Sequence, residues 1–161
     1  MKRTKYQDGF SLIEIVVGSA ACLMVLVGLL SAFTTIFQLS LANTNKVQAA
    51  FLEEEGLDAV RIMRDNGWTA NIASKTSGTA FYLNFIGGTW QSTTTNIYVD
   101  GTFERKVIIS DIYRDANQDI VQNGGSLDPK TKKVAVSISW LVKGATTTQS
   151  LSTYITNIFD N

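Results

Sequence analysis

Residues 9 to 42 read GFSLIEIVVGSAACLMVLVGLLSAFTTIFQLSLA, and only Glu14 among them is charged. The uncharged run continues from Ile15 to Asn45. A helix of about 20 apolar residues spans a bilayer, so this stretch is long enough to cross a membrane. An ordinary secretory signal has only about 7–15 apolar residues before its cleavage site. The sequence therefore predicts an apolar helix over 10–42 that is retained as an anchor.

The residues before this stretch predict the orientation of the anchor in the membrane. Lys2, Arg3 and Lys5 precede it, and the next basic residue is Lys46. Basic residues beside a membrane span favour the cytoplasmic side. We therefore expect the leader, residues 1–9, to lie in the cytoplasm and the bulk of the chain to lie outside the inner membrane.

Glu14 does not fit a plain anchor. A carboxylate in a membrane helix is costly near the bilayer centre and less costly near an interface. Glu14 therefore either lies at the headgroup boundary of an ordinary signal anchor or has a partner that another molecule supplies.

The run Gly9-Phe10-Ser11-Leu12-Ile13-Glu14, behind a short basic leader, resembles the class III signal of type IV prepilins and pseudopilins. The resemblance implies that a prepilin peptidase cleaves between Gly9 and Phe10 and methylates the new amine of Phe10. It makes Glu14 the fifth residue of the mature chain. There the carboxylate would pair with the N-terminal cation of a neighbouring subunit and set the axial register.

The same resemblance implies a function and a set of partners. The chain would dock by its N-terminal helix into a type IV pilus or a type II secretion or competence pseudopilus. Its partners would be prepilin peptidase, other pilin subunits, an inner-membrane platform, an assembly ATPase and, before assembly, membrane lipid. The chain has no cysteine pair for the C-terminal disulfide of many major pilins, which favours a minor pilin, a pseudopilin or a lineage without that disulfide.

Two other interpretations stay open. The chain is either such a subunit or an extracytoplasmic sensor or binding module on a permanent anchor. Ser19-Ala20-Ala21-Cys22 also faintly resembles a lipoprotein cleavage site, although Ser19 replaces the usual branched aliphatic residue. Otherwise Cys22 is a small apolar side chain within the anchor.

Composition narrows the function further. The 161 residues, 45% of them hydrophobic, suit one domain, and the zero net charge argues against a nucleic-acid-binding subunit. The chain has no histidine and one cysteine, which excludes Cys-His zinc sites, Ser-His-Asp triads and internal disulfides. No carboxylate pair or phosphate-binding loop stands out, so we predict no enzymatic activity.

Beyond the anchor, residues 43–66 continue the helix in amphipathic form, so that one helix runs from Phe10 to Asp65. The predicted apolar face consists of Val47, Ala50, Leu57 and Val60. The other positions carry Lys46, Glu53, Glu54, Asp58 and Arg61. Asp65-Asn66-Gly67 predicts the helix end, because glycine adopts the left-handed conformation there.

Residues 67–161 predict a globular β domain. Its strands are expected at 80–86, 97–100, 103–113, 134–142 and 149–159. Asp100-Gly101 predicts a tight hairpin turn, and Lys143-Gly144 with the following threonines predicts the last connection. Helix and antiparallel sheet together predict an α+β two-layer fold, which is also the pilin architecture that the resemblance implies. Trp68, Trp90 and Trp140 are expected in its core.

One loop could hold a cation. Asp115, Asn117 and Asp119 alternate as at the start of a calcium loop, and Asp128 follows closely. Ile120 and Ser126 stand where an EF-hand has Gly and Glu. The loop therefore predicts either a looser Ca²⁺ site, as some pseudopilins have near their C-terminal strands, or a solvated polar loop. No other cofactor is expected.

Overall fold

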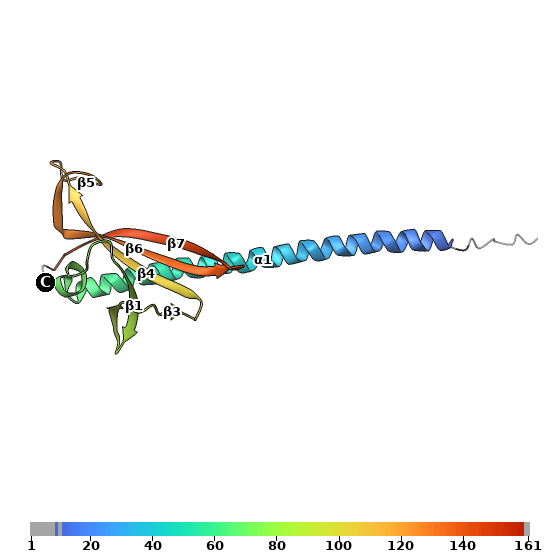
Figure 1. The fold of residues 1–161 in the computed structure, drawn as a ribbon, viewed down its shortest axis with the longest axis horizontal. Coiled ribbons are helices and arrows are strands. Elements are labelled where there is room, and N and C mark those ends of the chain that lie inside the picture. Colours follow the sequence, from blue (N-terminus) through green and yellow to red (C-terminus); the bar gives the residue numbers. More distant parts are fainter. Residues whose placement is uncertain (1–8, 10, 160–161) are drawn as a thin grey trace, which may run out of the picture. The chain divides into compact units, whose positions relative to one another are not determined.

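A computed structural model describes residue 9 and residues 11–159 (Figure 1). The chain falls into two compact units that divide between Asn43 and Thr44, and each is described by itself below. Helix α1 (Leu12–Asp65) supplies the first unit and begins the second.

The first unit consists of an exposed apolar helix. Every residue from Ser11 to Leu41 is exposed, including Leu12 at 81% and Met24 at 75%. The part of α1 from Leu12 to Leu41 rises about 45 Å at 1.5 Å per residue, which exceeds the roughly 30 Å hydrocarbon core of a bilayer. By length and composition this helix is suited to cross a membrane. The predicted first residue, Phe10, lies outside the described residues.

In the second unit α1 presents one apolar side to the sheet. Ala49, Gly56, Leu57, Val60 and Met63 are all buried, and separations of three, four and seven residues among them place them on one helix face. The predicted helix end is confirmed, since α1 ends at Asp65 and Gly67 has a φ of 147°.

The predicted apolar face was only partly right. Leu57 and Val60 are buried, but Ala50 is half-buried and Val47 is 57% exposed. Glu53, which we expected on the solvent side, is only 3% exposed. The 3.6-residue period explains the error, because it aligns position 53 with Ala49 and Leu57 on the buried face.

Seven strands form one antiparallel sheet over the described residues, in the order β2-β1-β4-β6-β7, with β3 and β5 both paired to β4. The strands are β1 (Ala80–Ile86), β2 (Thr89–Thr93), β3 (Tyr98–Val99), β4 (Phe103–Arg114), β5 (Ile120–Val121), β6 (Ser126–Val142) and β7 (Ala145–Thr156). A π-helical turn, η1 (Thr69–Ala73), precedes β1. The α+β prediction of a long helix packed on an antiparallel sheet is confirmed.

Both predicted hairpin turns are present. Asp100 and Gly101 have φ of 51° and 65° between β3 and β4, while Lys143 and Gly144 have φ of 52° and 83° between β6 and β7. Positive φ at both central residues gives the turn a twist that matches the flanking strands.

The strand boundaries differ from those predicted. The sequence analysis missed β2, β5 and the first eight residues of β6. Strand β7 begins at Ala145, so Thr146–Thr148 belong to the strand and not to the connection, and it ends at Thr156, not at residue 159. The two-residue turn explains the early start, because pairing resumes immediately after Gly144.

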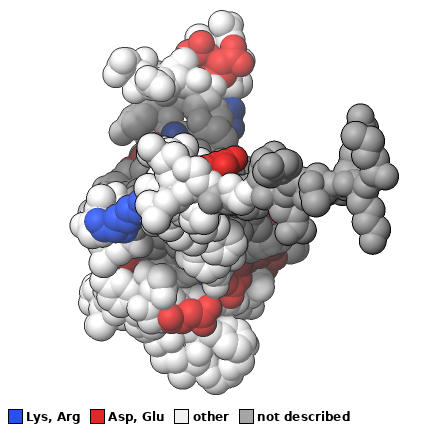
Figure 2. All heavy atoms as spheres, turned by 90° about the vertical axis from the view of Figure 1, so that its right-hand side faces the viewer, with Lys and Arg blue, Asp and Glu red and all other residues white. Residues whose placement is uncertain are grey.

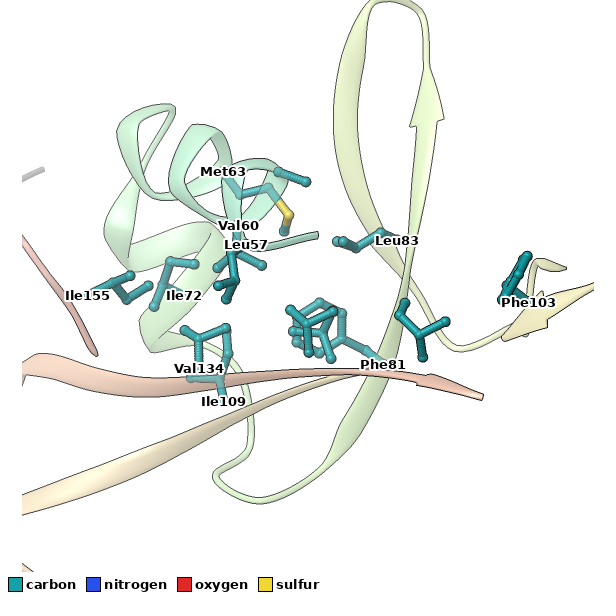
Figure 3. Packing of buried hydrophobic residues seen from close by; sticks show 14 of the residues in the cluster. Leu57, Val60, Met63, Ile72, Phe81, Leu83, Phe103, Ile109, Val134 and Ile155 are labelled. Carbon is teal, nitrogen blue, oxygen red and sulfur yellow. The ribbon is translucent and has the colours of Figure 1, made fainter. Parts of the chain in front are cut away.

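The core lies between α1 and the strands β4 and β6 (Figure 3). Alternate residues of each strand face the helix, with Phe103, Val107 and Ile109 on β4 and Val134, Val136 and Ile138 on β6. Trp68 and Trp140 are buried as predicted, and half-buried Trp90 packs against the same cluster.

Candidate functional site

The first candidate site is the beginning of α1. Gly9 is exposed, whereas Phe10 lies outside the described residues, so the geometry of the predicted cleavage bond is not described. Glu14 is exposed and lies in the first turn of α1, where its backbone N–H donates to the Ser11 carbonyl over 2.9 Å. The positive end of the helix dipole favours a carboxylate in that turn.

Within the described residues from Ser11 to Asn45, Glu14 is the one charged side chain. The helix surface remains apolar and exposed up to Leu41, and Cys22 is an exposed free thiol within it. Figure 2 shows a molecular face on which charged side chains form small, separate groups among uncharged residues. The exposed apolar surface of α1 up to Leu41 suits burial in lipid or against other apolar helices.

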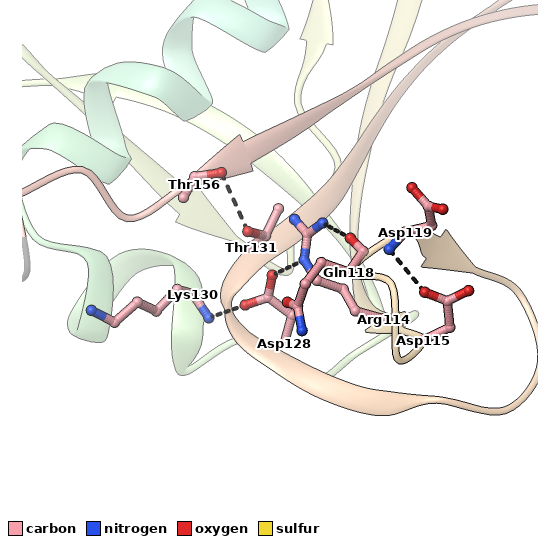
Figure 4. A network of polar contacts seen from close by, with 8 residues as sticks. All are labelled: Arg114, Asp115, Gln118, Asp119, Asp128, Lys130, Thr131 and Thr156. Atoms are coloured by element: carbon pink, nitrogen blue, oxygen red, sulfur yellow. Dashed lines mark hydrogen bonds and ion pairs between the residues drawn. The ribbon is translucent and has the colours of Figure 1, made fainter.

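The second candidate site is the loop between β4 and β6, which Arg114 holds together (Figure 4). Arg114 Nε donates to Asp128 Oδ2 over 2.7 Å, and its Nη1 donates to the Gln118 carbonyl over 2.7 Å. Burial alone would raise the pKa of Asp128, but hydrogen bonds from Arg114, the Lys130 amide and Thr131 lower it overall. Asp128 is therefore the anionic half of an ion pair.

Asp115 organises the turn from the other side. Its Oδ1 accepts hydrogen bonds from the backbone amides of Asn117 over 2.9 Å and Asp119 over 3.0 Å. Figure 4 shows the Asp119 carboxylate directed away from Asp115. An aspartate that bonds the backbone two residues on is a common way to stabilise a polar turn.

The loop does not gather the predicted calcium ligands into one site. Within residue 9 and residues 11–159, no three His, Cys, Asp or Glu side chains lie close enough together to hold a metal ion. Asp128 is paired with Arg114, and Asp115 bonds backbone amides. Calcium at Asp115, Asn117, Asp119 and Asp128 stays a prediction, and this geometry favours the polar-loop alternative.

A buried polar group escaped the sequence analysis. Glu53 Oε2 accepts a hydrogen bond from Gln149 Nε2 of β7 over 3.2 Å, and its Oε1 has no hydrogen-bond partner among the described residues. Burial raises the pKa of Glu53, and the bond from Gln149 opposes this in part. The signal was present in the sequence, since Glu53 is four residues from both Ala49 and Leu57.

Arg105 is a second buried charged side chain that the sequence analysis did not identify. It is 6% exposed, its Nη1 donates to Glu55 Oε2 over 2.8 Å, and its guanidinium lies 5.1 Å from the centre of the Trp90 ring. A guanidinium stacks well on an aromatic face. One signal in the sequence could have identified Arg105. It lies between Phe103 and Val107 in the alternation of β4, on the strand face that is buried.

Comparison with known proteins identifies no relative of this chain. The chain matches no protein-family model, no curated protein and no solved structure. The case for a function therefore rests on the residues from Gly9 to Glu14, the exposed apolar helix and the fold.

Proposed function

We propose that this chain is a prepilin-type subunit that is cleaved after Gly9, methylated on Phe10 and assembled into a filament. The filament is a type IV pilus or a type II secretion or competence pseudopilus. One observation carries the proposal: the Gly9–Glu14 motif leads directly into a helix whose exposed apolar surface continues, in the same α1, into the helix that packs on the sheet.

The exposed apolar surface of α1 is consistent with two successive locations, first a membrane and then a filament. Burying one Leu, Ile, Val or Phe side chain contributes about 1.5–3 kcal/mol, so a helix exposed from Leu12 to Leu41 is unfavourable in water. Lipid covers this surface before assembly, and the apolar helices of neighbouring subunits cover it afterwards. No charged residue from Ile15 to Asn45 hinders the transfer.

Glu14 provides the register of assembly. Cleavage frees an α-amino group on Phe10 that is cationic near neutral pH. An incoming subunit places that cation against Glu14 of a subunit already in the filament. Charge pairs within apolar surroundings are better supported as sources of specificity than of stability.

The remaining partners follow from this role. Residues 1–9 face the cytoplasm and are removed by prepilin peptidase, and the globular unit lies outside the inner membrane. An inner-membrane platform and an assembly ATPase drive the helix into the filament with other pilin subunits. The chain has no enzymatic activity of its own, and the subunit does not bind nucleic acid.

The decisive test is an intact mass and an N-terminal sequence after coexpression with a prepilin peptidase. We expect a product that begins at Phe10 and is one methyl group heavier than the unmethylated chain from Phe10 onward. Gly9→Leu should remain uncut. Gly18→Leu is the matched control and should be cleaved, because a Cβ at Gly18 meets nothing within 4 Å.

The other interpretations make different products. An uncut chain that begins at Met1 would instead identify a permanently anchored sensor or binding module. A product that begins at a lipidated Cys22 would identify a lipoprotein, and cleavage there would remove ten residues of α1, Leu12–Ala21.

A further inference from the structure

A row of polar and aromatic side chains crosses the sheet on the face turned away from α1. The register pairs Tyr98 of β3 with Glu104 of β4, Glu104 with Ser139 of β6, and Ser139 with Thr148 of β7. Side chains directly opposite on antiparallel strands lie on the same face of the sheet. Their chain neighbours Phe103 and Trp140 are buried in the core, so the row itself faces outward.

A shallow hollow of about 480 Å³ lies over this row. The residues that line it and matter here are Tyr98, Thr102, Glu104, Ser139, Leu141 and Thr146. Tyr98 is 57% exposed and Leu141 69% exposed, so apolar surface stands open to solvent beside hydroxyl groups and a carboxylate. That combination is typical of sites that orient a ligand by a few polar groups on an apolar base.

Glu104 is fixed in position by neighbours on three strands or loops. Its Oε1 accepts hydrogen bonds from Tyr82 Oη over 3.1 Å and from Asn96 Nδ2 over 2.9 Å, and Lys106 Nζ lies 3.6 Å from the same atom. Burial and the bond to Glu104 raise the pKa of Tyr82, which keeps it a donor. None of the hydrogen bonds among the described residues uses Glu104 Oε2. One acceptor oxygen is therefore held rigidly and left available.

The charge around Glu104 decides which ligand suits the hollow. Lys106 already offsets the carboxylate, so a second cation would gain less there than at an isolated acid. A neutral hydroxyl donor meets no such opposition and forms a charge-assisted hydrogen bond. The Ser139 and Thr148 hydroxyls bond each other over 2.9 Å, and each retains further hydrogen-bonding capacity.

We propose that this hollow binds a neutral carbohydrate. The free Glu104 oxygen accepts from sugar hydroxyls, Ser139 and Thr146 bond further hydroxyls, and the apolar face of the sugar ring lies against Tyr98 and Leu141. The site is independent of cleavage and assembly, so it stands or falls separately from the proposed function.

Saturation-transfer NMR on the full chain tests the proposal. Dodecylphosphocholine micelles are the suitable detergent, because their headgroup contains no sugar. The probes are the methyl β-glycosides of glucose, galactose and N-acetylglucosamine. We expect transfer to the ring protons of at least one, with a Kd in the millimolar range that is usual for single sugars on shallow sites.

Variants then locate the binding. Glu104→Gln and Tyr98→Ala should each weaken binding at least about tenfold, whereas Tyr98→Phe should retain it because the ring remains. Tyr113→Ala is the matched control, since Tyr113 is 42% exposed on β4 but lies outside the hollow. Near-native circular dichroism in each variant ensures that lost binding is not lost folding.

Three results would overturn the proposal. The first is absence of transfer to all three glycosides, and the second is equal binding by wild type, Glu104→Gln and Tyr98→Ala. The third is binding of N-acetyl-lysine methylamide that depends on Glu104 while the sugars fail, which would make the hollow a docking point for a basic protein side chain.

Discussion

Glu53 is an ionisable side chain that is buried in the globular unit. It is 3% exposed, and one of its two oxygens has no hydrogen-bond partner among the described residues. Burial disfavours the ionised form of this carboxyl more than the hydrogen bond from Gln149 favours it, so the pKa of Glu53 is raised. The unfolded chain does not bury this carboxyl, so Glu53 contributes to the pH dependence of stability.

The first prediction concerns that pH dependence. Above the ordinary glutamate pKa of 4.5, the folded chain binds more protons at Glu53 than the unfolded chain does. The free energy of unfolding therefore falls as pH rises from that value through the raised pKa. Glu53→Gln should remove this fall and stabilise the globular unit at neutral pH by about 1 kcal/mol.

Urea unfolding of the full chain in detergent, followed by tryptophan fluorescence between acidic and neutral pH, measures the effect. Glu54→Gln is the control, because Glu54 is exposed on the same helix and should keep the wild-type pH dependence. A Glu53→Gln curve that runs parallel to that of the wild type would contradict the prediction.

Gly56 shows how closely α1 approaches the sheet. A Cβ at this position would lie 2.8 Å from Val136 Cγ1 and 3.3 Å from Arg105 Cδ. Val136 is fully buried and β-branched, so its methyl groups have little freedom to move. The absence of a side chain at Gly56 is therefore what allows this contact.

The second prediction follows from that contact. Gly56→Ala should lower the free energy of unfolding by about 1 kcal/mol, because overpacking costs about 2 kcal/mol, the middle of its usual range, and the gain in helix propensity returns only about 1 kcal/mol. Gly28→Ala, where a Cβ meets nothing within 4 Å, should cause no loss. Equal urea midpoints for Gly56→Ala and wild type would refute the close approach.

Among the elements, the β6–β7 hairpin depends most on its turn. Twelve pairs of residues join the two strands, and only Lys143 and Gly144 connect them. Lys143 adopts a φ of 52°, a conformation that disfavours most side chains and that asparagine tolerates better. The hairpin therefore carries local strain at a single position.

The third prediction tests this strain. Lys143→Asn should raise the free energy of unfolding by about 0.5 kcal/mol, a part of the roughly 1–2 kcal/mol that a left-handed conformation costs an ordinary residue. Lys133→Asn is the matched control in the extended part of β6, where asparagine is a poor strand former and should destabilise. Two variants that shift the melting temperature in the same direction would argue against the turn explanation.

At the scale of the whole molecule, one continuous helix serves two environments. Its residues up to Leu41 are exposed and apolar, whereas from Ala49 onward one side is buried by the sheet. Under the proposed function, lipid and then other subunits cover the first surface, and Glu14 is the one charged side chain from Ser11 to Asn45 that can align them.

The fourth prediction rests on the proposed function. Glu14→Leu should leave cleavage after Gly9 intact but reduce assembled filaments by more than about tenfold, because removal of one partner of a buried charge pair costs about 3–5 kcal/mol. Sedimentation of sheared filaments, with the N-terminal sequence of the residual membrane form, separates the two steps. Glu54→Gln should assemble normally. Normal assembly by Glu14→Leu would remove Glu14 from the register.

The elements themselves were largely predictable from local patterns. The uncharged run after Glu14 predicted an apolar helix, which α1 contains, and Asp100-Gly101 predicted a hairpin between the correct strands. The candidate loop was only partly predictable. The spacing of Asp115, Asn117 and Asp119 indicated a turn, but the ion pair of Asp128 with Arg114 depends on strand pairing fourteen residues apart.

The sequence by itself therefore determined an apolar N-terminal helix, its single carboxylate and an antiparallel sheet that follows it in the chain. Periodicity and turn chemistry act over a few residues, which is why these features could be predicted. Only the tertiary structure decided that Glu53 bonds Gln149 and that Arg105 bonds Glu55. It also decided that Gly56 lies against Val136 and that Tyr98, Glu104 and Ser139 share one face. These facts depend on which strands become neighbours. Pairing between distant segments is set by the burial of the whole core, which no local pattern contains.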